Sequence, residues 1–237
     1  MTVLVTGAST GLGLAAVRAL LDAGHDVVLH ARSLDRVEDP AVLDRVADAV
    51  AADLADLDAV AALADRLAAH GPLEAVVHNA GVMRGPDVRT VNVLAPWVLA
   101  ARLPRPGRSV VLSSSMHRGG RAEVGAARAS SYEDSKLWVT ALVLHLAEAQ
   151  PDVLWHAVDP GWVPTRMGGA GAPDDLEEGH RTQVWLATAP EAEIDPRTGG
   201  YWRHHATQDP HPAALDPAFR AAVVERVVDL TGVDLPV

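Results

Sequence analysis

The stretch TVLVTGASTGLG, residues 2–13, decides the fold of this chain. Its apolar run, residues 2–6, predicts a β-strand, and the Ala/Leu-rich segment over residues 11–23, ended by Gly24, predicts an α-helix. The glycines between them permit a tight turn and a close approach of a ligand to the backbone. Because the first backbone N–H groups of a helix are free, this junction predicts a pyrophosphate site, and the alternative is a plain glycine-rich turn.

The rest of the chain alternates short apolar runs with Ala/Leu-rich segments of helical character. Such alternation, with strands that are apolar almost throughout, predicts a buried parallel sheet with helices on both faces. We therefore predict an α/β fold of the Rossmann type, a doubly wound parallel sheet flanked by helices, in a single domain over residues 1–237. The further strands are expected at residues 26–31, 49–52, 73–78, 109–114 and 153–158, and the further helices at residues 34–47, 57–69, 88–103 and 131–149.

Composition and charge narrow the range of partners. With 49% hydrophobic residues over 237 positions, the chain can fill a sizeable core. Its net charge of −11 argues against nucleic acid or an anionic membrane surface as a partner, since both attract basic proteins. No apolar run reaches the roughly 18 residues of a membrane span, and the first strand leaves no room for a signal peptide. We therefore expect a cytoplasmic protein without cysteine chemistry.

The end of the second expected strand indicates which dinucleotide is bound. A free ribose 2′-hydroxyl, as in NAD(H), is usually recognised by an acidic residue at this position, about 20 residues after the glycines. This chain has Arg32 and Ser33 there, with Arg36 close behind, and a guanidinium can bind a 2′-phosphate. We therefore favour NADP(H) over NAD(H), the alternative being that Arg32 is an ordinary surface arginine. Asp53, after the third strand, is suited to contact the adenine or to cap the next helix.

Lys136 is the only lysine in a chain with nineteen arginines, and it follows Tyr132 by four residues. On a helix these two side chains lie one turn apart on the same face. An ammonium beside a phenol favours the phenolate and lowers its pKa from about 10, which makes a tyrosine usable as an acid or base. Arginine could not replace this lysine, because its guanidinium is forked and permanently charged. The alternative is a helix that carries one Tyr and one Lys by chance.

Further motifs occur in order along the chain. They are Thr6-Gly7-x-x-x-Gly11-x-Gly13, Asp53-Leu54, Asn79-Ala80-Gly81, Asn92, Ser114, Tyr132-x-x-Ser135-Lys136 and Pro160-Gly161-x-Val163-x-Thr165. Each motif is weak alone, but in this order the chain resembles the short-chain dehydrogenase/reductase family over essentially its whole length. The segments at residues 113–117 and 132–137 are most similar to the retinol-dehydrogenase-like and carbonyl-reductase-like branches.

The resemblance implies an NADP(H)-dependent oxidoreductase that interconverts a ketone or aldehyde and its alcohol. Tyr132 would be the general acid or base, Ser114 would hydrogen-bond the substrate oxygen, and Lys136 would hold the nicotinamide ribose and lower the pKa of Tyr132. Asn92 would support a backbone distortion and an ordered water that relays protons, which completes the catalytic set. The implied cofactor-binding positions are Gly7, Ser9, Thr10, Gly11, Leu12, Gly13, Arg32, Ser33, Asp53, Leu54, Asn79, Ala80, Gly81, Tyr132, Lys136, Pro160, Gly161, Val163 and Thr165.

Three consecutive serines precede the tyrosine, and the two faces of a strand separate them. Ser113 and Ser115 would face one side and Ser114 the other, and the resemblance selects Ser114. We expect His117 to be a partly exposed loop histidine rather than a substrate contact. Asn92 comes after a segment shorter than that of relatives, which affects either its role or the packing of its helix.

The segment at residues 162–180 follows the sixth expected strand, where open parallel sheets bind ligands. Its glycines predict a mobile lid, and Trp162 and Met167 could line the inner face; the alternative is a surface loop. We expect a small carbonyl or alcohol substrate and favour an apolar one. No metal site is predicted, because the nearby histidines of the C-terminal part, His204, His205 and His211, form no compact ligand set.

The end of the chain also resembles the family. Residues 199–202 resemble its last strand, and residues 217–230 resemble a closing helix that would join a homodimer or homotetramer. A catalytically idle NAD(P)-binding sensor on the same fold is the alternative function, although such proteins commonly lose the tyrosine or the lysine. An epimerase or dehydratase would need a larger substrate domain than 237 residues allow. We therefore favour the enzyme.

Overall fold

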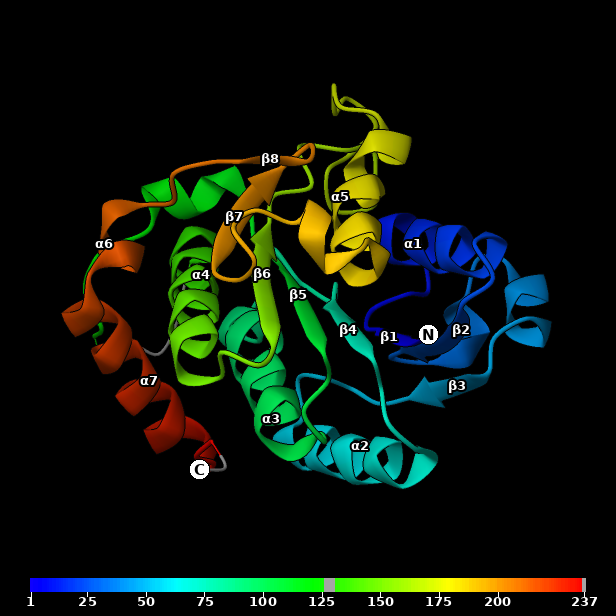
Figure 1. The fold of residues 1–237 in the computed structure, drawn as a ribbon, viewed down its shortest axis with the longest axis horizontal. Coiled ribbons are helices and arrows are strands. Elements are labelled where there is room, and N and C mark those ends of the chain that lie inside the picture. Colours follow the sequence, from blue (N-terminus) through cyan, green and yellow to red (C-terminus); the bar gives the residue numbers. More distant parts are fainter. Residues whose placement is uncertain (126–130, 236–237) are drawn as a thin grey trace.

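One eight-stranded sheet forms the centre of the computed structural model, which describes residues 1–125 and 131–235 (Figure 1). The strand order is β3-β2-β1-β4-β5-β6-β7-β8, and every neighbouring pair is parallel except the last. The order reverses between β1 and β4, and such a reversal opens a crevice at the carboxyl ends of the strands. The strands are β1 Thr2–Val5, β2 Asp26–Ala31, β3 Asp48–Ala51, β4 Ala75–His78, β5 Arg108–Leu112, β6 Leu154–Val158, β7 Gly200–Arg203 and β8 Ala206–Thr207.

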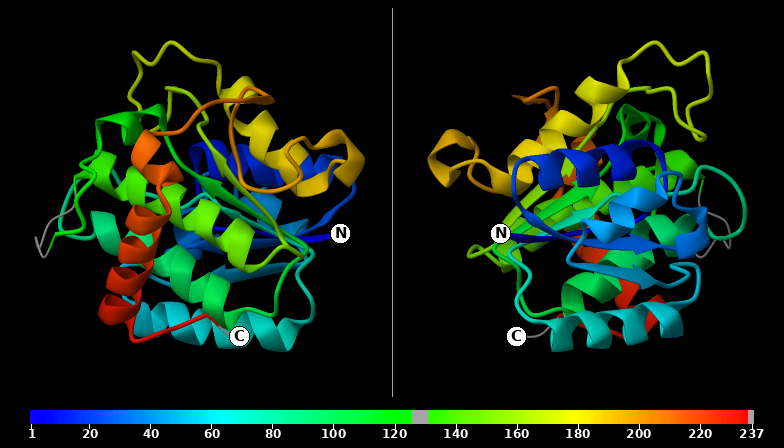
Figure 2. Two further views of the ribbon diagram at one scale, coloured as in Figure 1. Left: turned by 60° about the vertical axis from the view of Figure 1, so that its left-hand side comes forward. Right: turned by 90° about the vertical axis from the view of Figure 1, so that its right-hand side faces the viewer.

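Helices cover both faces of this sheet (Figure 2). The alternation within β1 decides the two sides: Val3 and Val5 pack with α1 and α5, whereas Leu4 packs with α2 and α3. The helix α4 covers the second face beside α3, and α7 packs on its outer side. In the described part of the chain, no helix is long and apolar enough to cross a membrane. The helices are α1 Gly11–Asp22, α2 Leu57–His70, α3 Ala95–Arg102, α4 Tyr132–Ala149, α5 Leu176–Thr188, α6 Pro212–Leu215 and α7 Pro217–Thr231.

The predicted fold is confirmed, but one predicted helix is wrong. The segment at residues 34–47 contains two short 3-10 helices, Leu34–Arg36 and Pro40–Asp44, in place of one α-helix. Pro40 explains the break, because proline lacks an N–H donor and disfavours a helical conformation in the residue before it.

The elements that were not predicted include α5, α6 and β8. The helix α5 begins within the segment at residues 162–180, so the expected lid is shorter than predicted and ends at Asp175, which caps α5 by accepting from the Glu177 N–H at 2.8 Å. Gly179 weakens the helical pattern of this segment in the sequence. Glycine is required there because a Cβ would lie only 2.6 Å from Val163 Cγ1. The antiparallel β8 follows a two-residue turn, in which His204 and His205 have φ angles of 50° and 60°, as a type I′ turn requires.

Buried histidines make the fold sensitive to acid. Burial lowers the pKa of His78 and of His156 to about 4, from an ordinary value of 6.5. His156 accepts hydrogen bonds at Nδ1 from the Gly200 N–H and from Trp202 Nε1, so the folded protein holds a neutral ring. The unfolded chain, in contrast, takes up a proton on each imidazole as the pH falls below 6.5.

We expect the free energy of unfolding to fall as the pH is lowered from 7 towards 4. A histidine whose pKa is depressed by folding stabilises the native state above its unfolded pKa, and this stabilisation is lost as the pH falls through the window between the two values. The loss is about 2 kcal/mol for each of His78 and His156 at pH 5. Urea unfolding between pH 7.5 and pH 5 measures it, and His78→Leu should flatten the pH dependence. An unchanged slope in His78→Leu would contradict the assignment.

Candidate functional site

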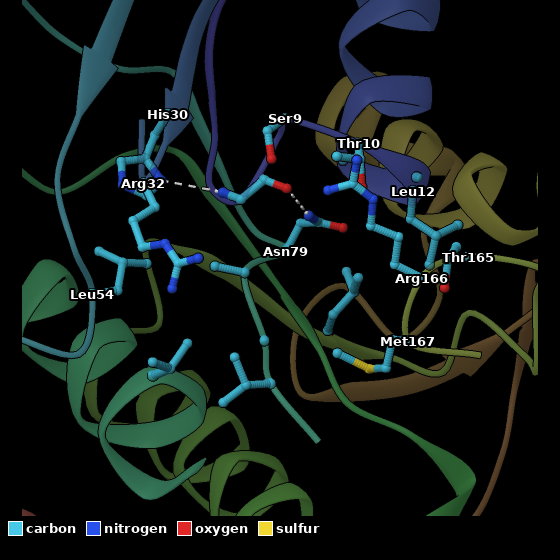
Figure 3. A pocket seen from close by; sticks show the side chains of 18 of the residues that line it. Ser9, Thr10, Leu12, His30, Arg32, Leu54, Asn79, Thr165, Arg166 and Met167 are labelled. Carbon is cyan, nitrogen blue, oxygen red and sulfur yellow. Dashed lines mark hydrogen bonds between the residues drawn. The ribbon is translucent and has the colours of Figure 1, made fainter. Parts of the chain in front are cut away.

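A groove of about 590 Å³ opens at the carboxyl ends of the strands (Figure 3). It collects residues from the loops that follow the strands β1 to β6, which are far apart in the sequence, together with the start of α4. The predicted cofactor residues that line it are Gly7, Ser9, Thr10, Gly11, Leu12, Gly13, Arg32, Asp53, Leu54, Asn79, Ala80, Gly81, Tyr132, Pro160 and Thr165.

Four predicted cofactor residues do not line the groove. The Ser33 hydroxyl is hydrogen-bonded to Asp35. Val163 is buried, and its side chain packs against Gly179 of α5. Gly161 adopts a φ of 83° beside Asp174, in a space where a Cβ would meet the carboxylate at 2.5 Å. Lys136 lies just below the groove, with its Nζ 3.8 Å from the position of a Cβ on Gly81.

The glycine-rich loop is packed so tightly that side chains are excluded. A Cβ on Gly7 would lie 2.7 Å from Ala80 Cα, and one on Gly13 would lie 2.4 Å from Asn79 Nδ2. Asn79 fixes the loop by donating from Nδ2 to the carbonyl oxygens of Thr6 at 2.9 Å and Gly7 at 3.1 Å. Thr10, the N-cap of α1, makes no side-chain capping bond, so the first turn of α1 offers its N–H groups to a ligand. This cradle fits a dinucleotide pyrophosphate.

His30 supports the glycine-rich loop, and we did not predict this role from the sequence. Its Nδ1 accepts a hydrogen bond from the Gly7 N–H at 3.2 Å, so its Nε2 donates to the Ala52 carbonyl oxygen at 3.1 Å. Burial lowers the pKa of His30, which keeps the ring neutral. The apolar run around His30 gave no signal for this bridge, because both partners are backbone groups distant in sequence.

We call the end of the groove beside Arg32 the adenosine end, because the sequence predicts the adenosine there, and this end carries free positive charge. Arg32 and Arg36 line it and are exposed, and no carboxylate within residues 1–125 and 131–235 forms an ion pair with Arg32. Asp53 faces the same end, and its Oδ1 accepts from the Ala55 N–H at 3.0 Å. The interpretation of Asp53 as the cap of the next helix is wrong, because Asp56 caps α2 through the N–H groups of Asp58 and Ala59.

Of the three serines, Ser114 is the one hydrogen-bonded to the Tyr132 phenol. The hydroxyl of Ser113 is instead buried and paired with Thr140 at 2.7 Å. The argument from strand alternation does not apply here, because β5 ends at Leu112 and Ser114 begins a 3-10 helix at Ser115–Gly119. Tyr132 is placed by the start of α4, where Ser131 caps the helix by accepting from the Asp134 N–H.

Lys136 is buried beneath the phenol. Its Nζ donates to the Leu112 carbonyl oxygen at 2.6 Å and lies 5.5 Å from the centroid of the Tyr132 ring. Burial lowers the pKa of Lys136 to about 8, opposed by the negative charge of Asp159.

The expected lowering of the Tyr132 pKa is wrong for this structure. Burial raises the pKa of Tyr132 to about 12, and the hydrogen bond from Ser114 opposes this shift only in part. The neighbouring amine cannot reverse it, since Lys136 loses its own proton at about pH 8, well before the phenol would ionise. Near neutral pH, the Tyr132 phenol is therefore protonated.

Asn92 lies in a distorted turn next to this pair. The segment Thr90–Leu94 is a π-helical turn, and the buried Asn92 amide exchanges two hydrogen bonds with the Val82 backbone, at 2.8 and 2.9 Å. Its Nδ2 also donates to Ser135 Oγ at 3.0 Å. The shortened segment before Asn92 thus still brings it to the residue that precedes Lys136.

The expectation that His117 is a partly exposed loop residue is wrong. His117 is fully buried, and its ring lies 4.7 Å from that of Tyr201. Its Nε2 accepts from the His211 N–H at 2.9 Å, so its Nδ1 donates to the Ser114 carbonyl oxygen at 2.7 Å. His117 therefore ties the serine loop to the segment before α6. His211 itself caps α6 through the Ala213 N–H.

The segment after β6 forms the wall opposite the adenosine end. The Thr165 methyl group lies 3.1 Å from the position of a Cβ on Gly11, which places this segment against the start of α1. Trp162 is 58% exposed and Met167 is 39% exposed, and the Met167 methyl reaches to 4.0 Å from the position of a Cβ on Gly81. Arg166 and Met167 line the groove without having been predicted as cofactor contacts.

Known proteins share this sequence and fold. The family model described as short chain dehydrogenase matches residues 1–175. The chain is 34% identical to the short-chain dehydrogenase chyC of Penicillium rubens, over 99% of this chain and 98% of that protein. It is 32% identical to the putative daunorubicin C-13 ketoreductase DnrU of Streptomyces sp., over 85% and 82%. A putative NAD(P)-dependent gluconate 5-dehydrogenase from Beutenbergia cavernae, solved with bound NADP, superimposes with a TM-score of 0.71 at 27% identity, over 86% and 94%.

Proposed function

Because the chain belongs to the short-chain dehydrogenase/reductase family and is an NAD(P)-dependent oxidoreductase of carbonyl and CH–OH groups, we propose that it reduces a ketone or aldehyde with NADPH. Tyr132 is the general acid in this proposal. The observation that carries it is the convergence of Ser114, Tyr132 and Lys136 at one end of a groove whose other end carries Arg32.

The residues of this site divide the work of proton transfer. Bound NADPH supplies the hydride for the carbonyl carbon. Tyr132 donates its phenolic proton to the carbonyl oxygen, and Ser114, now its hydrogen-bond partner, donates to the same oxygen and fixes its position. Lys136, whose Nζ donates to the Leu112 carbonyl oxygen, would hold the ribose hydroxyls of the cofactor. The π-helical turn around Asn92 would hold a water that returns a proton to this end. The raised pKa of Tyr132 keeps the phenol protonated, which supports reduction over oxidation near neutral pH.

The positive adenosine end supports NADPH as the cofactor. Arg32→Asp should weaken NADPH binding by about tenfold to a hundredfold, because it removes a charge-assisted hydrogen bond to the 2′-phosphate and adds repulsion. NADH binding should change far less. Titration of each cofactor by nicotinamide fluorescence measures both affinities. Arg102→Asp is the matched control, since Arg102 pairs with Asp65 and does not line the groove. Equal losses for the two cofactors would rule out the 2′-phosphate contact.

The segment after β6 supports an apolar substrate. Met167 lines the groove and reaches towards Gly81, and Trp162 exposes a second large apolar side chain in the same segment, although it does not line the groove. Trp162 is held by a hydrogen bond from its Nε1 to the Gly168 carbonyl oxygen at 2.8 Å. The ketoreductase name of the Streptomyces relative also supports a ketone.

A substrate panel tests the proposal directly. Aldehydes, ketones and secondary alcohols of increasing apolar size would be offered with NADPH, NADP, NADH and NAD, and turnover followed by nicotinamide absorbance. We expect NADPH oxidation with an apolar ketone or aldehyde. Tight NADPH binding without turnover of any compound would contradict the proposal and favour a cofactor-sensing protein.

A further inference from the structure

An arginine on the substrate side of the groove forms an ion pair across its wall. Arg166 Nη2 lies 2.9 Å from Glu38 Oε1, which joins the segment after β6 to the segment after β2. Both side chains are largely exposed, at 62% and 48%, so water screens the pair and little free energy opposes its separation. A more highly charged anion could therefore replace Glu38 as the partner of Arg166.

The position of Arg166 is set by the residue before it. Thr165 packs against Gly11 at the start of α1, and the Gly168 N–H donates to Thr165 Oγ1 at 3.1 Å. Figure 3 shows Arg166 extending from this point towards the glycine-rich loop, with Arg32 on the other side of the loop. The two arginines thus flank the turn that offers its N–H groups to a pyrophosphate.

The glycine-rich loop supplies no cation of its own. Residues 6–13 contain no Lys or Arg, and the first arginine of α1, Arg18, is paired with Asp39 at 2.8 Å. Among the described residues, the arginines that line the groove are Arg32, Arg36, Arg84 and Arg166. Only Arg166 follows β6, where the chain contacts the start of α1. In a protein with a net charge of −11, a local cation would add to the N–H groups of α1 in offsetting the pyrophosphate charge.

Glu38 is fixed beside the same loop. Its backbone N–H donates to the Ser9 carbonyl oxygen at 3.0 Å, which holds the carboxylate near the residues that would receive the phosphates. A carboxylate in this place repels a pyrophosphate and competes with it for Arg166.

We propose that Arg166 is a ligand of the cofactor pyrophosphate and that Glu38 is the partner it leaves when the dinucleotide binds. This inference rests on the proposed function, because it assumes a dinucleotide in the groove. It assigns opposite effects to the two members of one ion pair. Arg166 strengthens dinucleotide binding, and Glu38 weakens it.

Two nucleotide fragments separate the two phosphate sites. ADP-ribose carries the pyrophosphate without a 2′-phosphate, and adenosine 2′-monophosphate carries the 2′-phosphate without a pyrophosphate. Calorimetric titration should show that Arg166→Gln lowers the affinity for ADP-ribose by about tenfold and leaves the affinity for adenosine 2′-monophosphate unchanged. Arg32→Gln should lower the affinity for adenosine 2′-monophosphate and leave that for ADP-ribose unchanged. Glu38→Gln should raise the affinity for ADP-ribose several-fold.

Distinct outcomes would overturn the inference. If Glu38→Gln weakened the binding of ADP-ribose as Arg166→Gln does, the role of the ion pair would instead be to maintain the shape of the groove. If Arg166→Gln left ADP-ribose unchanged, or weakened adenosine 2′-monophosphate instead, Arg166 would not bind the pyrophosphate. Failure of the proposed function looks different, because NADPH would then bind without turnover of any compound, and the fragment affinities of the variants would be unaffected by that result. A wild-type protein that bound neither ADP-ribose nor adenosine 2′-monophosphate would overturn the inference itself.

Discussion

Tyr132→Phe should reduce kcat for carbonyl reduction by roughly 10²–10⁴-fold while NADPH still binds, because it removes the proton donor and leaves the ring in place. Ser114 interacts with this phenol, and Lys136 Nζ lies 5.5 Å from the centroid of its ring. Steady-state rates with the best substrate of the panel measure the loss, and fluorescence titration measures NADPH affinity.

The second tyrosine of the chain provides the control. Tyr201 is buried, and its hydroxyl has no hydrogen-bond partner among the residues that the structure describes. Tyr201→Phe therefore removes no bond and should keep near-normal activity. Near-normal activity in Tyr132→Phe would end the assignment of Tyr132 as the acid.

Lys136→Arg should lower kcat/KM on the order of 100-fold although the charge is kept, since a small displacement of a positioned group has effects of this size. The Nζ is buried, donates to Leu112 at 2.6 Å and lies close beneath Gly81, which leaves no space for a forked guanidinium. Arg181→Lys should leave kcat/KM unchanged. It exchanges the same two residue types on the exposed side of α5.

The pH profile gives Lys136 a second test. Burial lowers the pKa of Lys136 to about 8, so the wild-type rate should decline above that pH as the ammonium is lost. Lys136→Arg should lack this decline, because the pKa of arginine stays above the range of the assay. A normal rate with an unchanged decline in Lys136→Arg would show that another group carries this role.

Local patterns predicted those parts of the fold that depend on near neighbours. The strand β2 occupies the predicted residues 26–31, because an uninterrupted apolar run is buried on both faces. The glycine-rich junction was also found, because it stands between a strand and a helix that are adjacent in the sequence. The contacts that require Gly7 and Gly13, with the distant Ala80 and Asn79, could not be predicted. The helix α5 was missed, because Gly179 weakens the helical pattern for the sake of a contact with Val163, sixteen residues earlier.

The sequence predicted which residues form the site, but not how their surroundings shift their pKa values. The sequence indicated Ser114, Tyr132 and Lys136, yet the pKa of Tyr132 moved in the opposite direction from the one expected. Spacing on a helix gives proximity to a charge, whereas desolvation depends on everything packed around the phenol. The same reason explains His30 and His117, which accept hydrogen bonds from the backbone N–H groups of Gly7 and His211 in distant segments.

The contact between Thr165 and Gly11 constrains how this protein could be redesigned. Under the proposed function, one wall would be shared by the dinucleotide and the substrate, because the segment that carries Trp162 and Met167 also packs against the start of α1. Libraries that alter substrate range should therefore vary Trp162 and Met167 and keep Thr165 fixed. We expect that insertions next to Thr165 would raise the KM for the cofactor along with any gain in substrate scope.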